Sequence, residues 1–364
     1  MSPPPKQTRS TTDAHQFRDP ADMHPLDAVA LSKYLTPLGL VIDPDVKVQQ
    51  FATGLANLNY RLSVNGRLVV LRRPPPGDLP PGAHDMKREH RVLSRLHIVH
   101  PLAPESLHLC EDTTVIGVPF QIIEYRPGLV IKGDDRTLLD GHPQRCAELG
   151  QMLVSTLVSI HEVDVADIGL QDFGKPTGFV ARAIAGWRAR AERLQPVPST
   201  ATLANELGDW LERQAIAVRT PTLLHCDFKL DNTILDPQTL EPRAVVDWDM
   251  STRGDPLFDV ATLLSYWTEP GDPECMQRLA QMPTNAPGFP TRDEIAERYG
   301  DLTGIDMTDL PALRVLAIYK LAVVFLQLHA LYGVGPTANP KYANFDTLGE
   351  DLLLFTRDVA DGRG

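Results

Sequence analysis

The first third of the chain is built from short β-type runs, and its clearest pattern is a hairpin. Asn65-Gly66 separates the runs YRLSV and RLVVLR, and an Asn-Gly pair between β-type runs is the strongest short-range hairpin signal. The run VKVQQF precedes the hairpin, a helical stretch opens at Asp85, and the strand-like runs ESLHLC and VPFQIIEY follow. We therefore predict a small antiparallel sheet with one main helix packed on it.

The pattern becomes helical after Gly128. Apolar residues recur at helical spacings, and the predicted helices are Pro143–Val163, Phe179–Leu194, Leu203–Val218, Pro256–Trp267 and Asp309–Tyr332. The short β-type segments TLLHC, NTILD and RAVVDWD lie between the third and fourth of these helices. The sequence thus predicts an α+β protein whose larger second half is mostly helical and holds a few short strands.

The length of the chain and the change in its sequence pattern indicate separate regions. A chain of 364 residues exceeds what one compact core usually holds, which favours two lobes or two domains. Residues 1–22 are rich in Pro, Ser and Thr and have no apolar segment of the kind a secretory signal needs, so we predict a disordered tail. The change of pattern then predicts an N-terminal lobe over residues 23–125 and a C-terminal lobe over residues 126–364.

Charge and cysteine content argue against several classes of protein. The net charge of −12 disfavours a nucleic-acid or anionic-membrane partner, since both need a basic footprint. No stretch approaches the roughly 18 uncharged apolar residues of a membrane span. The cysteines are scattered without a CxxC pair (Cys110, Cys146, Cys226 and Cys275), which argues against a zinc site and a disulfide framework. We therefore expect a cytoplasmic protein.

The most informative stretch is residues 223–259, which contains the pattern H-x-D-x-x-x-x-N at His225, Asp227 and Asn232, followed by an apolar strand that ends in Asp247. Phosphoryl transfer leaves the protein little covalent chemistry, so it needs positioning and charge neutralisation. One carboxylate takes the proton of the acceptor hydroxyl, while an amide and a second carboxylate hold Mg²⁺. Asp227, Asn232 and Asp247 supply two carboxylates and an amide of this kind.

Each of these residues also has an ordinary structural interpretation. An Asp and an Asn at this spacing are common by chance and usually cap loops, and Asp247 could be a turn residue at a strand end. The order of the residues, their spacing and the apolar runs TLL, TIL and AVV before each element favour a joint functional interpretation.

This stretch resembles the aminoglycoside phosphotransferase family of kinase-like small-molecule kinases, and most closely the branch associated with acyl-CoA dehydrogenases. The resemblance covers about residues 25–355, and HCDFKLDN and VVDWDMSTRGDPLFDVA are its most specific parts. It implies a bilobal protein-kinase-like fold and a transferase that uses Mg²⁺ with ATP or GTP. It also implies that Asp227 is the base and that Asn232 and Asp247 are magnesium ligands. The family usually has His-Gly-Asp where this chain has Cys226 at the middle position.

The resemblance also implies supporting roles. His225 would support the site from behind the base and the metal ligands. Asp249 would lie near the metal or the acceptor, or could equally be a hydrogen-bond acceptor behind the site. Asp255 and Asp259 resemble the family's GDP-x-x-D helix start, where Asp255 is better explained as an N-cap. His161 ends a predicted helix, and we expect a buried capping histidine there rather than a ligand.

Candidate nucleotide contacts precede this stretch. FATGLANLN occupies the place of a kinase glycine-rich loop but has the single glycine Gly54, with Asn57 and Asn59 beside it, and an ordinary surface hairpin is the alternative. Arg72 stands where a kinase carries lysine, and Glu89 on the next helix is its expected ion-pair partner. Solvated surface charge is the alternative for both.

The segment ending in Glu124 and Tyr125 is the expected hinge, whose backbone would meet the adenine. The sequence says less about the chemical class of the acceptor. The helix Phe179–Leu194 is rich in arginine and could receive a carboxylate or a CoA phosphate, although a solvated face explains it better.

Two functions remain in view. The first is a small-molecule kinase acting on a hydroxyl acceptor, with a hydroxyacid or hydroxyacyl-CoA preferred over an aminoglycoside or amino alcohol. The second is a pseudokinase-like nucleotide-binding module that partners an acyl-CoA dehydrogenase. The intact set of Asp227, Asn232 and Asp247 favours the first, while Arg72 and the glycine-poor loop favour the second.

Overall fold

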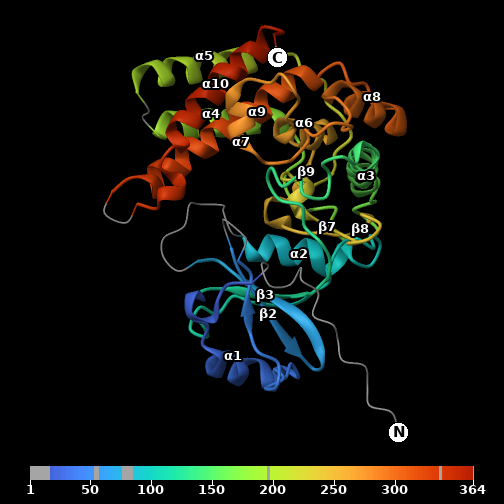
Figure 1. Cartoon of the computed structure of the whole chain (residues 1–364), viewed down its shortest axis with the longest axis vertical. Coiled ribbons are helices and arrows are strands. Elements are labelled where there is room, and N and C mark those ends of the chain that lie inside the picture. Colours follow the sequence, from blue (N-terminus) through green and yellow to red (C-terminus); the bar gives the residue numbers. More distant parts are fainter. Residues whose placement is uncertain (1–16, 53–56, 76–84, 195–196, 336–337, 364) are drawn as a thin grey trace. The chain divides into compact units, whose positions relative to one another are not determined.

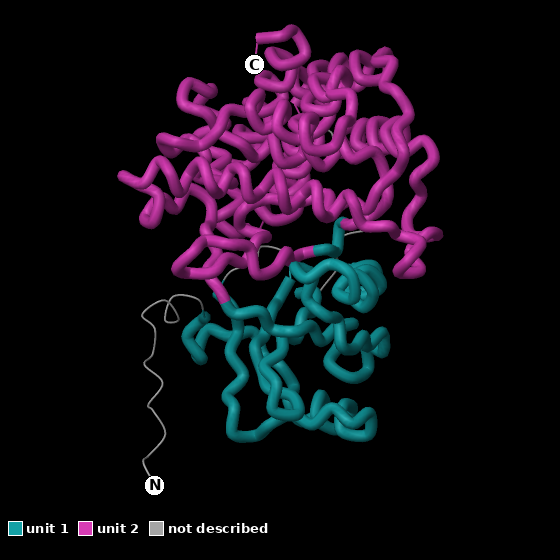
Figure 2. Tube along the Cα trace, turned by 90° about the vertical axis from the view of Figure 1, so that its right-hand side faces the viewer, with its two compact units in different colours: residues 1–127, 248–250 teal, residues 128–247, 251–364 magenta. Residues whose placement is uncertain are grey.

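The computed structural model describes residues 17–52, 57–75, 85–194, 197–335 and 338–363. The chain divides into two compact units (Figure 2). Unit 1 comprises residues 1–127 together with Trp248–Met250, and unit 2 comprises residues 128–247 and 251–364. The described chain begins at Phe17, which forms an isolated β-bridge with Phe51, and a single 3-10 turn follows at Pro20–Asp22. Most of the tail predicted over residues 1–22 lies outside the described residues.

Unit 1 holds a fully antiparallel sheet, which has five strands among the described residues (Figure 1). The strands are β1 (Gln49–Gln50), β2 (Leu58–Val64), β3 (Arg67–Arg73), β4 (Ser106–Cys110) and β5 (Phe120–Glu124), in the order β1-β2-β3-β5-β4. The predicted hairpin is confirmed: Val64 pairs with Arg67 around a two-residue turn in which Asn65 and Gly66 have φ values of 51° and 76°. Positive φ at both central positions is the reason Asn-Gly suits this turn.

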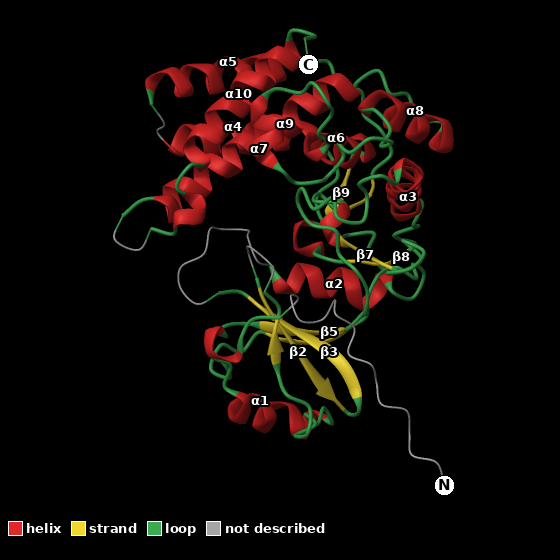
Figure 3. Cartoon of the chain, in the orientation of Figure 1, coloured by secondary structure: helices red, strands yellow, loops and turns green. Residues whose placement is uncertain are grey.

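Alternation along the strands gives the sheet two different faces. Helix α1 (Ala28–Leu35), which the sequence analysis missed, packs its Leu31 and Leu35 on one face together with Tyr60 and Leu71. Helix α2 (Met86–Leu96) contacts β4 and β5 and lies on the other side of the sheet (Figure 3). Because side chains alternate between faces, Arg72 points away from the α1 core, toward α2.

Unit 2 is mostly helical, as predicted. Its helices are α3 (Pro143–His161), α4 (Phe179–Leu194), α5 (Pro198–Glu212), α6 (Pro256–Tyr266), α7 (Glu274–Leu279), α8 (Arg292–Thr303), α9 (Leu310–Leu328) and α10 (Phe345–Ala360). Two-stranded antiparallel ribbons pair β6 (Thr222–Leu224) with β9 (Thr252–Gly254), and β7 (Thr233–Leu235) with β8 (Pro242–Val245). The largest boundary difference is α5, predicted over Leu203–Val218, which starts earlier because Pro198 suits the first turn of a helix.

Helix α9 is the central helix of unit 2 and packs against α6 and α10. With the π-helical turn His329–Gly333 that follows it, α9 is the one stretch in the described part of the chain with the length and composition of a membrane-crossing helix. Within its most apolar window, 61% of the residues are buried inside the protein. Its Lys320 is buried and hydrogen-bonded, so packing against protein accounts for its apolar character.

Candidate functional site

The loop after β6 carries the start of the predicted motif, and a buried carboxylate holds its backbone. The N–H groups of His225 and Cys226 donate to the two carboxylate oxygens of Asp259, at 2.6 and 2.8 Å. Asp259 lies in the first turn of α6 and is fully buried. Because a buried N–H without a partner costs about 1–3 kcal/mol, this pairing fixes the path of the loop.

Two further helices hold Asp259 in turn. His161, the last residue of α3, places Nε2 3.4 Å from Asp259 Oδ2 and Nδ1 2.7 Å from the hydroxyl of Tyr299 on α8. His161 is buried, as the sequence analysis expects, and it supports the carboxylate that holds the loop. Asp255 caps α6 through the Leu257 N–H at 3.0 Å, which confirms the N-cap interpretation.

Cys226 has the left-handed φ of 66°, a conformation that glycine adopts without strain. This backbone requirement explains why the resembling family usually has glycine at this position. Lys320 of α9 donates from Nζ to the Cys226 carbonyl oxygen at 2.9 Å. The strained residue is therefore held at its N–H by Asp259 and at its carbonyl by Lys320.

His225 is buried, and both of its ring nitrogens face backbone groups. Nε2 lies 3.0 Å from the Val246 carbonyl oxygen, which can only accept, so Nε2 carries the proton. Nδ1 lies 3.3 Å from the Asp227 N–H, which can only donate, so Nδ1 accepts. Burial lowers the pKa of His225 and favours this neutral form. The ring thus joins the loop to the residue after β8.

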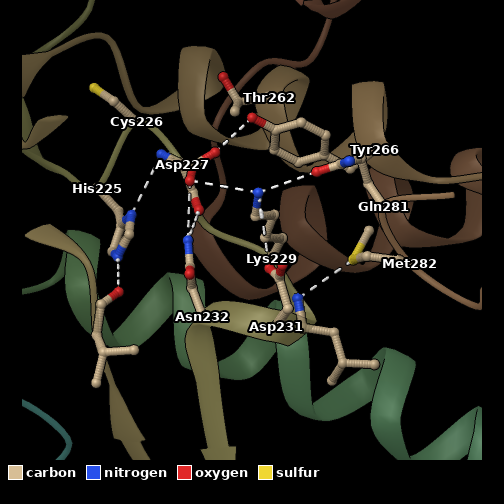
Figure 4. A network of polar contacts seen from close by, with 12 residues as sticks. His225, Cys226, Asp227, Lys229, Asp231, Asn232, Thr262, Tyr266, Gln281 and Met282 are labelled. Carbon is tan, nitrogen blue, oxygen red and sulfur yellow. Dashed lines mark hydrogen bonds and ion pairs between the residues drawn. The ribbon is translucent and has the colours of Figure 1, made fainter. Parts of the chain in front are cut away.

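Asp227 is the centre of the polar network in Figure 4. Its Oδ1 accepts from the Tyr266 hydroxyl at 2.5 Å, and its Oδ2 accepts from Asn232 Nδ2 at 3.0 Å and lies 3.5 Å from Lys229 Nζ. Burial would raise the pKa of Asp227, but Lys229, Tyr266 and Lys320 outweigh burial and lower the pKa. The carboxyl is therefore ionised at neutral pH, as a general base must be.

Lys229 joins two acidic residues in this network (Figure 4). Its Nζ lies 3.8 Å from Asp231 Oδ1, 3.1 Å from Gln281 Oε1 and 4.8 Å from the ring centroid of Tyr266. Burial lowers the pKa of Lys229, yet the nearby carboxylates, with Asp227 first, raise it overall, so the ammonium stays charged. Burial raises the pKa of Asp231 to about 6.

The β7–β8 ribbon brings the two predicted metal ligands to one end of the hairpin. The Val246 N–H donates to the Asn232 carbonyl oxygen at 2.9 Å, and Asp247 follows with a left-handed φ of 69°. Asn232 also donates from Nδ2 to the Asp227 carbonyl oxygen at 2.8 Å. Since Nδ2 is engaged with Asp227, the amide oxygen is the atom left to bind a cation.

This donor set fits Mg²⁺, which takes one or two carboxylates from the protein and completes its shell with phosphate oxygens and water. Within the residues that the structure describes, no group of three or more His, Cys, Asp or Glu side chains could hold a metal ion. A metal at Asn232 and Asp247 would therefore depend on nucleotide oxygens.

Unit 1 brings Arg72 of β3 and Glu89 of α2 together. Arg72 Nε lies 2.8 Å from Glu89 Oε2, and both side chains are buried. Arg72 Nη2 also lies 3.5 Å from Asp249 Oδ2, and Asn57 Nδ2 donates to the same oxygen at 3.1 Å. The other oxygen of Glu89 accepts from the Trp248 N–H at 3.1 Å. One buried guanidinium thus joins the α2 carboxylate to the segment that follows Asp247.

Asp249 accepts a hydrogen bond from Asn57 and pairs with Arg72 within unit 1, which are contacts that its interpretation as a hydrogen-bond acceptor requires. Asn59 lies in β2 directly opposite Arg72, and its amide oxygen is buried without a hydrogen-bond partner among the described residues. Gly54 lies outside the described residues. Asn57 and Asn59 are thus the polar residues of the predicted loop that the structure places near Arg72.

The expected hinge residues follow β5. Glu124 pairs with Arg126 at 2.9 Å and accepts from the Glu105 N–H at 3.2 Å. Tyr125 donates its N–H to the Leu68 carbonyl oxygen at 3.4 Å, and the first segment of unit 1 ends two residues later, at Pro127. The Glu124 side chain is thus engaged in local contacts, and a role toward adenine rests on the backbone.

The arginine-rich helix α4 uses much of its charge locally. Arg188 bridges to Asp209 and Glu212 of α5 at 2.7 and 2.9 Å. Arg190 lies 4.2 Å from the ring centroid of Trp187, and Arg182 donates to carbonyl groups of the preceding loop. These contacts favour a structural role for α4 over recognition of an anionic acceptor.

Arg72→Lys tests whether the second contact of the guanidinium, from Nη2 to Asp249, stabilises unit 1. Lysine keeps the charge, but it has one nitrogen where Arg72 uses Nε toward Glu89 and Nη2 toward Asp249. We expect unit 1 to lose about 1.5–3 kcal/mol of stability, since one buried carboxylate loses its charged partner. Urea unfolding measures the loss.

Arg67→Lys on the same strand is the matched control, because Arg67 is 58% exposed and lies 4.0 Å from Glu105. Its effect should stay within about 0.5 kcal/mol. If Arg72→Lys were as stable as Arg67→Lys, the contact between Arg72 and Asp249 would contribute nothing to the stability of unit 1.

Sequence patterns did not single out several residues that complete the site. Tyr266, Lys229 and Lys320 all contact the Asp227 loop. The available signal was a polar stripe on the apolar helix α6, at Asp259, Thr262 and Tyr266. These positions are three and four residues apart and therefore share one helix face. Lys320 in the middle of an apolar helix was a second signal.

Comparisons with known sequences place these features in context. A family model described as "Phosphotransferase enzyme family" (APH) matches residues 47–297. Acyl-CoA dehydrogenase family member 10 of Mus musculus is 34% identical over 340 residues, which is 92% of this chain and 31% of that protein. Acyl-CoA dehydrogenase family member 11 of Rattus norvegicus is 30% identical over 90% of this chain and 42% of that protein. The chain thus spans well under half the length of these relatives.

Solved structures share the fold. A candidate aminoglycoside phosphotransferase of Ralstonia eutropha has a TM-score of 0.74 at 23% identity, covering 93% of this chain and 99% of that chain. A thermostable aminoglycoside phosphotransferase APH(4)-Ia, solved with AMP-PNP and hygromycin B, has a TM-score of 0.59 at 19% identity, covering 92% and 99%. The predicted kinase-like α+β fold is confirmed.

Proposed function

Since the chain belongs to the phosphotransferase enzyme family, we propose that it moves the γ-phosphoryl group of Mg-ATP to a hydroxyl of a small molecule. The predictions of the family and of a phosphotransferase are confirmed by the family match. The observation that carries the finer proposal is the placement of the Asp227 carboxylate, which accepts a hydrogen bond from Asn232 on a loop whose backbone Asp259 and Lys320 hold.

In this proposal Asp227 orients the acceptor hydroxyl and receives its proton. The loop keeps the carboxylate in place through the contacts of its backbone with Asp259, His225 and Lys320. Such preorganisation matters because misplacing a catalytic group by about 1 Å can cost about 100-fold in rate. Arg72, held by Glu89, would neutralise negative charge on the nucleotide phosphates, and Asn57 and Asn59 would offer polar groups to the same phosphates. The backbone of Glu124 and Tyr125 would form the hinge.

Asn232 and Asp247 would hold Mg²⁺, which supplies neutralisation of phosphate charge when bound. Asp247→Ala should therefore raise the dissociation constant of Mg-nucleotide about 10- to 100-fold. Titration of a fluorescent ATP analogue measures it. Glu241→Gln is an exposed charge removal on the same hairpin and should leave affinity unchanged.

Removing the metal gives an internal control for this variant. Wild-type protein titrated in EDTA should bind nucleotide as weakly as Asp247→Ala does in Mg²⁺. Undiminished affinity of the variant in Mg²⁺ would exclude Asp247 as a ligand.

For the acceptor we propose a hydroxyacid or hydroxyacyl-CoA, because the chain resembles parts of acyl-CoA dehydrogenase family members. A nucleotide-consumption screen with ATP and GTP against hydroxyacids, hydroxyacyl-CoAs, amino alcohols and aminoglycosides tests this, with Asp227→Asn as the blank. If nucleotide is consumed only with amino alcohols or aminoglycosides, the proposed acceptor class is wrong. We further propose a cytoplasmic protein that works with an acyl-CoA dehydrogenase. The pseudokinase alternative is left with the glycine-poor loop and Arg72 in its favour.

A further inference from the structure

Tyr266 ends helix α6 with its side chain aimed at Asp227 (Figure 4). Every residue of α6 from Pro256 to Tyr266 is buried, and Tyr266 itself is 5% exposed. Its hydroxyl donates to Asp227 Oδ1 at 2.5 Å, within the usual range for a hydroxyl bound to an ionised oxygen. A phenol at the end of an apolar helix thus makes its hydrogen bond to the proposed base.

Packing alone does not explain this bond. Tyr319 of α9 is also buried, and its hydroxyl has no hydrogen-bond partner among the residues that the structure describes. Unit 2 therefore holds a buried phenol without giving it a carboxylate. Phenylalanine would fill the position of Tyr266 equally well if volume were its only purpose.

The contacts of Asp227 distinguish its two oxygens. Oδ2 receives Asn232 and the Lys229 ammonium, whereas among the described contacts Oδ1 receives Tyr266 alone. A carboxylate oxygen can accept about two hydrogen bonds, so Oδ1 is the oxygen with room for an acceptor hydroxyl. The Tyr266 ring also lies 4.8 Å below Lys229 Nζ, which keeps the ammonium beside Oδ2.

We propose that Tyr266 is a positioning residue for phosphoryl transfer: its hydroxyl fixes the rotation of the Asp227 carboxylate so that Oδ1 faces the acceptor. This inference rests on the proposed function. In the transfer the acceptor oxygen forms a bond to the γ-phosphorus, and its proton passes to Asp227. The bond from the γ-phosphorus to the bridging oxygen breaks, and the nucleoside diphosphate leaves with that electron pair. Tyr266 keeps its own proton throughout.

Tyr266→Phe tests the proposal, because it removes only the hydroxyl and keeps the ring beneath Lys229. We expect kcat for Mg-ATP hydrolysis, with water as the probe acceptor, to fall about 10- to 100-fold. The KM and the dissociation constant for Mg-ATP should stay within about threefold, because Tyr266 acts through the base. Tyr319→Phe is the matched control and should behave as the wild type. A purely structural role would instead lower the melting temperature and spare kcat of the folded enzyme.

A double variant separates this inference from the proposed function. If Tyr266 acts through Asp227, adding Tyr266→Phe to Asp227→Asn should lower the residual rate no further. If the rate losses of the two single variants multiply in the double variant, Tyr266 does not act through Asp227 and the positioning role is excluded. The positioning role is also excluded if Tyr266→Phe keeps full turnover while Asp227→Asn is inactive. That second result leaves the proposed function intact. If the wild type consumes no more nucleotide than Asp227→Asn with water or any screened acceptor, both proposals fall.

Discussion

Asp227→Asn should lower phosphoryl transfer about 10²- to 10⁴-fold, the usual range for loss of a general base. Asparagine has the same shape, but its amide cannot take a proton from an acceptor hydroxyl. The NH₂ group of the new asparagine would also face other donors, which is unfavourable. Tyr266 and Asn232 donate hydrogen bonds to this position, and the Lys229 ammonium lies beside it. The wild-type pKa of Asp227 is lowered mainly by Lys229 and Tyr266, against the effect of burial, so the wild-type base is ionised at the assay pH.

The measurement pairs turnover with nucleotide binding. The Kd for Mg-ATP should change by no more than a few-fold in Asp227→Asn, because Asn232 and Asp247 are kept. Asp231→Asn is the matched control: it removes a carboxylate that also lies near Lys229, at 3.8 Å, without touching Asp227. Its turnover should stay within about tenfold of the wild type. Full activity of Asp227→Asn on its acceptor would exclude the base assignment.

The sequence predicts the parts of the fold and site that depend on local pattern. The Asn65-Gly66 turn and the helix α4 over Phe179–Leu194 are found where expected, because turn chemistry and helical periodicity are properties of adjacent residues. The motif residues Asp227 and Asn232 fall on one loop because only five positions separate them. Helix α1 was missed, since it is short and follows a stretch with the composition of a disordered tail.

The supporting residues could not be predicted because their contacts are long-range. Tyr266 meets Asp227 across 39 residues of sequence, and Lys320 meets Cys226 across 94. Both lie in helices whose apolar pattern marks them as core, so periodicity alone assigns them to packing. The sequence pairs Arg72 with Glu89, but the contact of Arg72 with Asp249 depends on a three-residue segment that belongs to unit 1 although it lies far along the chain.

Asp259→Ala should cost unit 2 about 2–6 kcal/mol of stability, because two buried N–H groups lose their acceptor at about 1–3 kcal/mol each. The carboxylate is fully buried and accepts from the N–H groups of His225 and Cys226. Alanine would leave both groups without an acceptor, in a loop where Cys226 already has the unfavourable φ of 66°. His161 would also lose the contact it makes at 3.4 Å.

Urea unfolding followed by tryptophan fluorescence measures this loss, since Trp267 of unit 2 is fully buried. Asp209→Asn is the matched control, because Asp209 is a 51% exposed carboxylate in unit 2 that pairs with Arg188, and its removal should cost less than about 1 kcal/mol. Asp259→Asn keeps one acceptor oxygen, so we expect about half the loss of unfolding free energy seen in the alanine variant. Expressed as a free energy, its loss of kcat should be larger than its loss of stability. If Asp259→Ala were as stable as Asp209→Asn, Lys320 and His225 alone would be sufficient to hold the loop, and Asp259 would not be its anchor.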